Sequence, residues 1–327
     1  MGNFPKFKEP PPSVNGVYIC SSPTEDCDAD SRAGLELLNR LSREQGWRAA
    51  ILATQTPGFI NYVGNPKRLI FLQLLPLTTH DAILEIGPGL GQFSIAIAQR
   101  VATLDALEVV PGQAEFCAER YRQEGAANIR VAVGGHDCTL PYEDGAFDGI
   151  VLNLVLEWCA QRAGFQSHRN VHKQMLAECA RVLKPGGFLY LVTKNRFSLR
   201  LLTGGRDEHM FRMRFGSALP RWFARVLCRA RPPGYLHSHR ELAALLRSSG
   251  FVHLDSYWST PEMRWPDHLI RFDTATFSQE RIGVPQGESR RTSLIAALLP
   301  DFMIKHIAPG LTFVATKRIE NRGAGAS

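Results

Sequence analysis

The sequence lacks any apolar run long enough to cross a lipid bilayer as a helix, which requires about 20 apolar residues. It also lacks the pattern of an export signal, because residues 1–15 are rich in proline and lysine and contain no apolar stretch. These absences argue against a secreted or membrane-spanning protein. We therefore expect a cytoplasmic protein whose first residues, 1–30, form a disordered lead-in.

Paired metal and disulfide ligands are also missing. The seven cysteines are scattered, odd in number and without a Cys-x-x-Cys pair, which argues against a disulfide framework and against a zinc knuckle. The ten histidines form no His-x-x-x-His pair beside carboxylates. We therefore expect reduced thiols and no required metal.

Lysine is absent from the most basic part of the chain, residues 196–236. This segment holds nine arginines and two acids, so it accounts for the whole formal charge of +7, and the rest of the chain is neutral by the same count. A concentrated basic segment on a neutral body predicts an anionic partner, such as phosphate, a nucleotide, nucleic acid or an acidic membrane surface. A solvated arginine-rich face is the simpler alternative.

Strand and helix patterns alternate regularly between residues 80 and 195. Short apolar segments predict strands at 82–86, 103–109, 129–133, 147–152 and 188–193, and amphipathic segments predict helices at 92–101, 111–124 and 172–183. This alternation with short connections predicts an α/β fold, with a mainly parallel sheet and helices on both faces. In such folds the ligand binds at the carboxyl ends of the strands.

Two long irregular stretches interrupt this rhythm further along the chain. Both leave the sheet at the end where functional loops are expected, so we interpret them as caps over a substrate. The expected organisation is a lead-in at 1–30, an N-terminal helical extension at 31–79, a core at 80–195, a basic cap insertion at 196–236, a continued core at 237–260, a second insertion at 261–309, a last strand at 310–318 and a disordered tail at 319–327.

The strongest motif is a buried strand that runs into a glycine-rich turn, Ile-Leu-Glu-Ile-Gly-Pro-Gly-Leu-Gly. Its glycines, Gly87, Gly89 and Gly91, let the backbone turn sharply and approach a ligand closely. A dinucleotide fingerprint would have its third glycine one position later, where this chain has Gln92. Glu108 ends the next expected strand, where a carboxylate can accept hydrogen bonds from both hydroxyls of a ribose.

The Gly-x-Gly-x-Gly spacing resembles motif I of the class I methyltransferases that use S-adenosylmethionine. The loop 133–147, the strand and turn at 147–158 and the turn at 181–187 resemble further motifs of that family, in the same order. The resemblance implies a Rossmann-like, mostly parallel sheet of seven strands with S-adenosylmethionine as cofactor. The cofactor-binding residues that it implies are Glu85, Gly87, Pro88, Gly89, Gly91, Gln92, Glu108, Val109, Asp137, Cys138, Asn153 and Leu154.

Two positions depart from the family pattern. The acid that meets the adenine amino group would stand where this chain has His136, and we assign the contact to the next residue, Asp137. A bacterial subgroup associated with cell-surface glycan biosynthesis is similar in four downstream segments, Asn195–Phe197, Asp207–His209, Leu219–Arg221 and 240–251. That subgroup has a glutamate before the Asn-Arg pair, where this chain has Lys194. The resemblance implies O-methylation of a sugar, a glycan intermediate or a related small metabolite.

Three residues are candidates for catalysis. Methyl transfer from a sulfonium is an in-line displacement, so the enzyme mainly aligns the acceptor atom, and a hydroxyl acceptor also gains from a general base. Glu157 follows the strand at 147–152, and Asp207 and His209 lie in the basic insertion. An unperturbed histidine titrates near ~6.5, in the range that a base requires. The acid and the histidine could equally do no more than pair with neighbouring arginines.

The segment 219–231 places apolar residues at helical spacing with arginines between them. Such a helix either makes a peripheral contact with an anionic membrane or closes over an anionic substrate, and we prefer the second alternative. An RNA methyltransferase is a competing function because of the net charge, although the amino-methylase motif Asn-Pro-Pro-Tyr is absent after the strand at 147–152. A cofactor-binding partner protein without transferase activity is a third.

Overall fold

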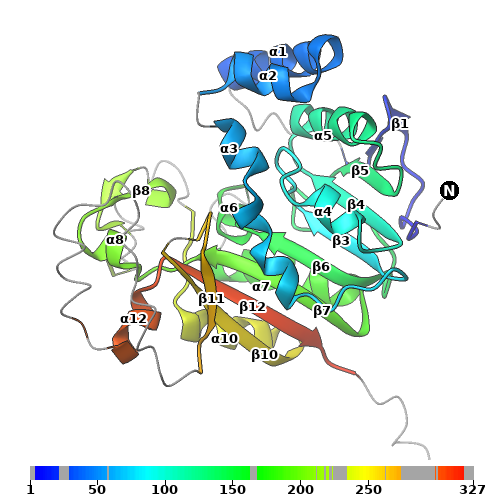
Figure 1. Ribbon diagram of the computed structural model, residues 1–327. Helices are drawn as coiled ribbons and strands as arrows, with labels where there is room; N and C mark the ends of the chain where they lie inside the picture. The colour runs from blue at the N-terminus through cyan, green and yellow to red at the C-terminus, as the bar shows by residue number, and fades with distance from the viewer. Residues whose placement is uncertain are drawn as a thin grey trace, which may run out of the picture.

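The computed structural model describes residues 4–21, 29–56, 59–162, 168–210, 212–216, 219–220, 234–261, 263–273 and 301–319, together with residues 223 and 299. Ten strands of this part of the chain form one sheet in the order β1-β2-β5-β4-β3-β6-β7-β12-β10-β11 (Figure 1). They are β1 (Ser13–Val14), β2 (Val17–Ile19), β3 (Ala82–Ile86), β4 (Thr103–Glu108), β5 (Ile129–Val133), β6 (Phe147–Asn153), β7 (Leu183–Lys194), β10 (Phe251–Thr260), β11 (His268–Arg271) and β12 (Gly310–Lys317).

The centre of the sheet is parallel and its far side is antiparallel. Neighbouring strands from β2 to β7 pair in parallel, whereas β12 pairs antiparallel with both β7 and β10. The expected α/β sheet is confirmed, and β1, β2 and β11 bring it to ten strands instead of seven. Because β3, β4, β6 and β7 are parallel, their carboxyl ends meet at one edge, and the residues that follow them are brought together.

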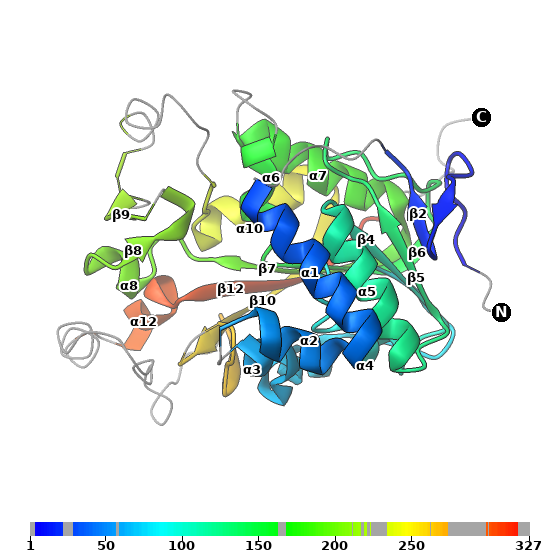
Figure 2. The same ribbon diagram turned by 90° about the horizontal axis from the view of Figure 1, so that it is seen from above.

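Helices cover both faces of the sheet, as expected (Figure 2). The α-helices are α1 (Ala29–Gln45), α2 (Trp47–Thr54), α3 (Phe59–Gly64), α4 (Ser94–Ala98), α5 (Pro111–Gln123), α6 (Leu156–Arg162), α7 (His168–Val182), α8 (Leu199–Leu202), α10 (His239–Ser248) and α12 (Asp301–Ile307), and the 3-10 helices are η1 (Pro66–Leu74) and η2 (Glu208–Met210). No helix in the described part of the chain has both the length and the apolar character needed to span a membrane.

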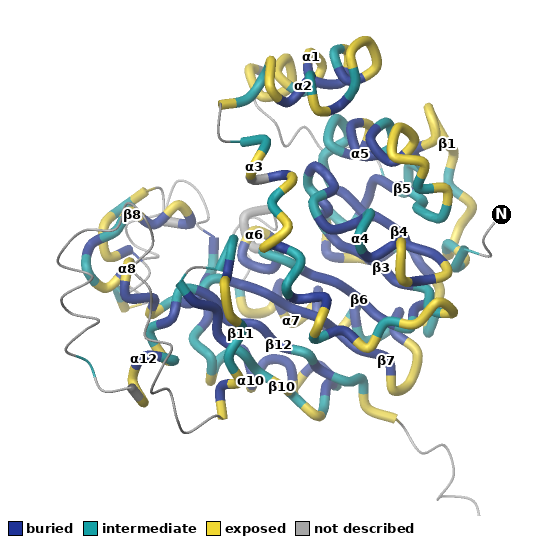
Figure 3. The backbone as a smooth tube through the Cα atoms, viewed as in Figure 1, coloured by how far each residue is buried: buried dark blue, intermediate teal, exposed yellow. Residues whose placement is uncertain are grey.

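Two apolar clusters hold these layers together. One face of the sheet packs against α6, α7 and α10 through residues such as Leu152, Leu176 and Leu246. The opposite face packs against η1 and α4 through residues such as Phe71 and Ile97. The central strands are accordingly buried along most of their length (Figure 3). This burial makes the sheet a rigid base for the loops at its carboxyl edge.

The N-terminal helices α1 and α2 lie over α5, which follows β4. The Asn39 side-chain amide donates a hydrogen bond to the Gly112 carbonyl at 2.9 Å, and the Trp47 indole donates one to Glu124 at 2.8 Å. Leu38 is fully buried in the cluster between these helices. Helices α1 and α2 are therefore fixed to the helix beside the glycine-rich turn.

The expectation of a disordered lead-in over residues 1–30 is wrong for residues 4–21. β2 extends the sheet by pairing in parallel with β5. The Phe7 ring stacks on Tyr142 with ring centroids 5.1 Å apart, and the Arg130 guanidinium lies 4.2 Å from the Phe7 ring centroid. Proline-rich composition predicted disorder, whereas these aromatic contacts with the sheet order the segment.

The two insertions are described only in part. The basic cap contains α8, η2 and a small two-stranded sheet of β8 (Arg206–Asp207) and β9 (Met213–Arg214). The second insertion begins with β11, which pairs with β10 and extends the main sheet, and it ends with α12. The expected helix at 219–231 lies outside the described residues except at Leu219, Pro220 and Phe223.

Candidate active site

The glycine-rich turn connects β3 to α4 at the carboxyl edge of the sheet. Gly87, Gly89 and Gly91 have φ angles of 69°, 61° and 74°, a region that residues with a Cβ rarely adopt. At Gly87 there is also no room for a side chain, because an added Cβ would lie 2.5 Å from Cγ2 of Val155. The turn thus packs directly on the residues that follow β6.

We expect Gly87→Ala to destabilise the fold by about 1 to 3 kcal/mol more than Gly145→Ala does, because only the first change overpacks a neighbour. Gly145 is a matched control, since its φ of 63° imposes the same backbone strain and nothing lies within 4 Å of its added Cβ. Urea denaturation of both variants measures the difference. Equal losses of unfolding free energy would mean that the Val155 side chain moves aside without a loss of stability.

Glu108 ends β4 and joins two turns. Its carboxylate accepts hydrogen bonds from the backbone N–H groups of Val109 at 2.8 Å, Val110 at 3.1 Å and Gly89 at 3.1 Å. Only 4% of Glu108 is exposed. The carboxylate is therefore held between the glycine-rich turn and the start of α5, and its contact with a ribose stays a prediction.

Glu85 points below the glycine-rich turn, into the space under α4. Its carboxylate accepts a hydrogen bond from the Ser94 hydroxyl at 2.5 Å, and the Tyr121 hydroxyl donates to Ser94 at 2.6 Å. Burial raises the pKa of Glu85 to about 7. Ser94 and Tyr121 were not identified from the sequence, because only the fold brings α4 and α5 against β3.

The loop expected to hold adenine follows β5. Asp137 is exposed, and its carboxylate accepts a hydrogen bond from the Thr139 backbone N–H at 2.9 Å. Cys138 is buried and has a φ of 61°. His136 lies 3.1 Å from the Ser21 hydroxyl, measured from Nδ1 to Oγ. Asp137 thus shapes the loop and faces solvent, and its contact with adenine stays a prediction.

The turn after β6 lies beside the glycine-rich turn. Leu154 has a φ of 59°, and its N–H donates to the Val192 carbonyl of β7 at 2.8 Å. The next residue, Val155, is the one that contacts Gly87. Asn153 and Leu154 therefore lie beside the glycine-rich turn, and their contact with the cofactor stays a prediction.

A buried group of ionisable side chains follows β6 and β7. Glu157 is 0% exposed, and its Oε2 accepts a hydrogen bond from the Thr193 hydroxyl at 2.9 Å. Its other oxygen, Oε1, has no hydrogen-bond partner among the described residues. Burial raises the pKa of Glu157, and the charge of Lys194 opposes that shift. The catalytic candidate from the sequence is thus enclosed beside a lysine.

Lys194 connects the end of β7 to the basic cap. Its Nζ lies 3.0 Å from Nε2 of His209 and in direct contact with the carboxylate of Glu208. Burial lowers the pKa of Lys194 to about 8, and Glu157 partly offsets this effect. We refer to Glu157, Lys194, Glu208 and His209 as the ionisable cluster.

His209 is an unfavourable proton acceptor in this arrangement. It is 1% exposed, its Nε2 faces Lys194, and a Cβ added to Gly234 would lie 2.7 Å from its Nδ1. Burial, Lys194 and Arg264 lower the pKa of His209 to about 3. A group with so low a pKa binds a proton only weakly at neutral pH, so it is a poor general base. His209 instead contacts the Lys194 amine within hydrogen-bond distance.

Asp207 also has a structural task. It is 1% exposed, and its Oδ1 accepts a hydrogen bond from the His209 backbone N–H at 2.9 Å. This contact fixes the start of η2 and so the position of His209. The structure thus brings all three catalytic candidates to one place. It also adds Lys194 to them. The sequence pointed to Lys194 only through its departure from the family pattern.

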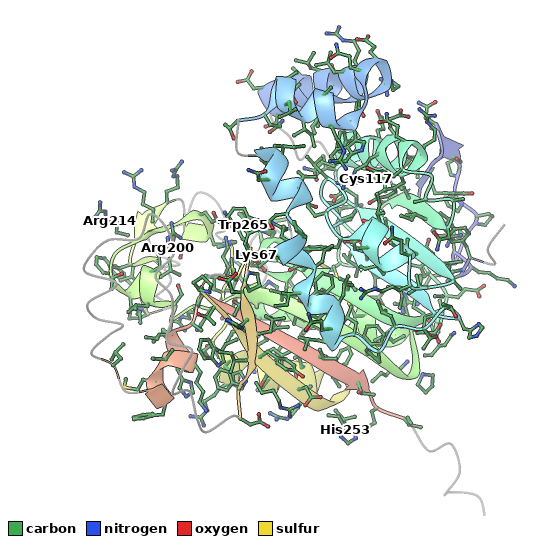
Figure 4. All side chains as sticks on the ribbon, viewed as in Figure 1. Lys67, Cys117, Arg200, Arg214, His253 and Trp265 are labelled. Carbon is green, nitrogen blue, oxygen red and sulfur yellow. The ribbon has the colours of Figure 1, made fainter. Side chains whose placement is uncertain are left out.

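Two arginines of the basic cap, Arg200 and Arg214, are exposed (Figure 4). The charge of Arg200 contributes to the lowered pKa of Lys194. In the described part of the chain, no group of three or more histidine, cysteine, aspartate or glutamate side chains is arranged to hold a metal ion.

Comparison with known proteins identifies the core. Residues 84–191 match the family model of the methyltransferase domain. The bifunctional biotin biosynthesis protein BioHC of Cellvibrio japonicus is 35% identical over 111 residues, which are 34% of this chain and 19% of that protein. Malonyl-[acyl-carrier protein] O-methyltransferase of Methylococcus capsulatus is 30% identical over 113 residues, which are 34% of this chain and 36% of that protein.

The name of a third relative gives RNA as its substrate. The tRNA (guanine-N(7)-)-methyltransferase of Limosilactobacillus fermentum is 30% identical over 116 residues, which are 35% of this chain and 53% of that protein. The chain thus spans about half or less of the length of these curated relatives, and the shared part is the core that carries the glycine-rich turn. Residues 84–191 are therefore an S-adenosylmethionine-dependent methyltransferase domain.

Proposed function

We propose that the protein transfers the methyl group of S-adenosylmethionine to an oxygen of a small anionic acceptor, such as a sugar, a glycan intermediate or a related metabolite. The observation that carries this proposal is the position of the ionisable cluster. It follows β6 and β7, next to the turn at Asn153 and Leu154 that packs on the glycine-rich turn. A proton acceptor and the expected methyl donor are thus close together.

In this proposal, some residues at the carboxyl edge of the sheet bind the cofactor and others accept the proton. S-adenosylmethionine supplies an activated methyl group, so the protein has only to align the acceptor oxygen for in-line displacement. Glu108 and the glycine-rich turn hold the cofactor's ribose and amino acid portions. Lys194, whose pKa is lowered to about 8, accepts the proton that an acceptor hydroxyl loses. His209 and Glu157 orient the Lys194 amine.

Formation of S-adenosylhomocysteine tests the proposal. Purified protein is incubated with S-adenosylmethionine and with separate pools of cellular sugars, sugar phosphates, lipid-linked glycans and RNA. We expect turnover with a pool of small anionic molecules. Calorimetric binding of S-adenosylmethionine without turnover on any pool would support the alternative of a cofactor-binding partner protein.

RNA methylation is the second candidate, because a tRNA methyltransferase is among the relatives and the charge of +7 is concentrated in residues 196–236. Retention on immobilised RNA and on heparin across a salt series separates the two functions. An RNA methyltransferase should show a steep loss of affinity with salt that is specific to RNA. Equal retention on both polyanions would indicate a general basic surface.

A further inference from the structure

The two-stranded ribbon of β8 and β9 in the basic cap has one buried face and one exposed face. In β8, Asp207 is 1% exposed, whereas its neighbour Arg206 is exposed. In β9, Met213 stands opposite Asp207, and the exposed Arg214 stands opposite Arg206. Because side chains alternate across a strand, and directly paired residues point to the same side, Arg206 and Arg214 share the outer face of the ribbon.

This pairing of two arginines is unfavourable by itself. Directly opposed side chains have Cβ atoms about 4.5 to 5.5 Å apart, and like charges at this spacing destabilise a strand pair. Among the described residues, Arg206 and Arg214 have no ion-pair partner, and neither has the exposed Arg212 in the connecting turn. The nearby carboxylate of Glu208 pairs instead with Lys194. An anionic partner on the outer face would relieve the repulsion between the arginines.

An exposed aromatic ring lies beside the paired arginines. Phe215 directly follows β9 and is 46% exposed. A Cβ added to Gly204 would lie 2.9 Å from Cζ of Phe215, and one added to Gly205 would lie 2.7 Å from Cγ of Arg200. These two glycines directly precede Arg206, so the ring and the stem of Arg200 are next to the ribbon. We refer to Arg200, Arg206, Arg212, Arg214 and Phe215 as the cap surface (Figure 4).

The composition of the cap surface fits an anionic membrane better than a small ion or RNA. Small-molecule sites are concave, whereas these side chains are exposed on the outside of a ribbon. Single-stranded RNA is bound by a charged groove with several stacking rings, and the described part of this ribbon offers one ring. Peripheral binding to an anionic bilayer gains free energy from basic residues near lipid phosphates and from apolar side chains that enter the interface. The cap surface supplies both.

We propose that the cap surface docks the protein on a membrane that contains anionic phospholipids. The inference goes beyond the proposed methyl transfer and does not depend on it. The arginines contact lipid phosphates, and the Phe215 ring enters the headgroup region. The buried face of the same ribbon carries Asp207, which accepts the hydrogen bond from the His209 backbone. Docking therefore holds the ionisable cluster close to the lipid surface.

Co-sedimentation with lipid vesicles tests the role of the arginines. We expect the wild-type protein to sediment with vesicles of equimolar phosphatidylcholine and phosphatidylglycerol, and to stay in the supernatant with phosphatidylcholine alone. Arg206→Gln combined with Arg214→Gln should weaken binding to the mixed vesicles about 30-fold, because each basic residue near an anionic surface contributes about fivefold. Thermal denaturation should show this variant to be folded, since neither side chain has a described ion pair to lose.

A matched control removes two exposed arginines at another place. Arg40 and Arg43 are exposed on α1, and replacing both by glutamine lowers the net charge by the same amount. This variant should sediment with the mixed vesicles as the wild type does. An equal loss of binding in the control would show a response to net charge alone and would contradict docking through the cap surface.

Phe215→Asn tests the apolar part of the cap surface. Phe215 has a φ of 59°, and asparagine tolerates this left-handed conformation. The change should weaken binding to the mixed vesicles about fivefold or more, because the exposed ring no longer enters the interface.

Two results would overturn the docking proposal. One is the absence of wild-type sedimentation with the mixed vesicles, and the other is equal sedimentation of the wild type and the variant that lacks Arg206 and Arg214. If the wild type ignores vesicles but is retained on immobilised RNA, and the same two replacements abolish that retention, the cap surface is an RNA-binding surface instead.

Discussion

Replacement of Glu108 by alanine is expected to weaken binding of S-adenosylhomocysteine about 100-fold or more. Each charge-assisted hydrogen bond from a ribose hydroxyl contributes about 1.5 to 3 kcal/mol, and two such bonds are lost. The change also removes the acceptor for three backbone N–H groups, including that of Gly89, so the glycine-rich turn loses part of its support. Isothermal titration calorimetry measures the affinity directly.

Two further variants show which part of Glu108 matters. Glu108→Gln keeps the shape and one acceptor oxygen, so it should retain the fold and lose affinity through the missing charge. Glu115→Ala removes an exposed carboxylate from α5 and should leave affinity unchanged. If Glu108→Ala stays folded in thermal denaturation and binds S-adenosylhomocysteine as the wild type does, the cofactor site has been misplaced.

The glycine-rich turn and the carboxylate beside it were predictable because their signals are local in the sequence. Gly87, Gly89 and Gly91 stand within five residues of one another, and their positive φ angles are what the close turn requires. Glu108 could be placed as well, since parallel strands bring their carboxyl ends to one edge. Short-range patterns therefore located both turns and the carboxylate between them.

Packing between distant segments was not predictable in the same way. The proline-rich composition of the lead-in predicted disorder. Composition gives no sign that Phe7 packs on Tyr142, which lies 135 residues away in the sequence. His209 was selected for the ordinary pKa of histidine, whereas its burial against Lys194 lowers that pKa to about 3. Such shifts arise from the surroundings that only the folded chain supplies.

Replacement of Lys194 by methionine is expected to lower kcat about 10²- to 10⁴-fold, the usual contribution of a general base. Methionine preserves most of the apolar stem of lysine, and burial, which raises the pKa of Glu157, favours the neutral form of this carboxyl once the neighbouring cation is gone. The fold and the affinity for S-adenosylhomocysteine should therefore persist. Lys184→Met, at the opposite end of β7 where the lysine pairs with Asp148, is the control and should retain wild-type turnover.

The pH dependence separates a proton acceptor from a structural lysine. Below its pKa of about 8, Lys194 carries its proton and cannot accept another, so the logarithm of kcat/KM should rise by about one per pH unit and level off above pH 8. Lys194→Met should abolish this rise, whereas a lysine that only supports the fold would leave the profile in place at a reduced rate. The rise reports a group that must lose its proton before it can act, and for Lys194 the active form is the free amine. An unchanged profile in Lys194→Met would assign the proton transfer to another group of the ionisable cluster.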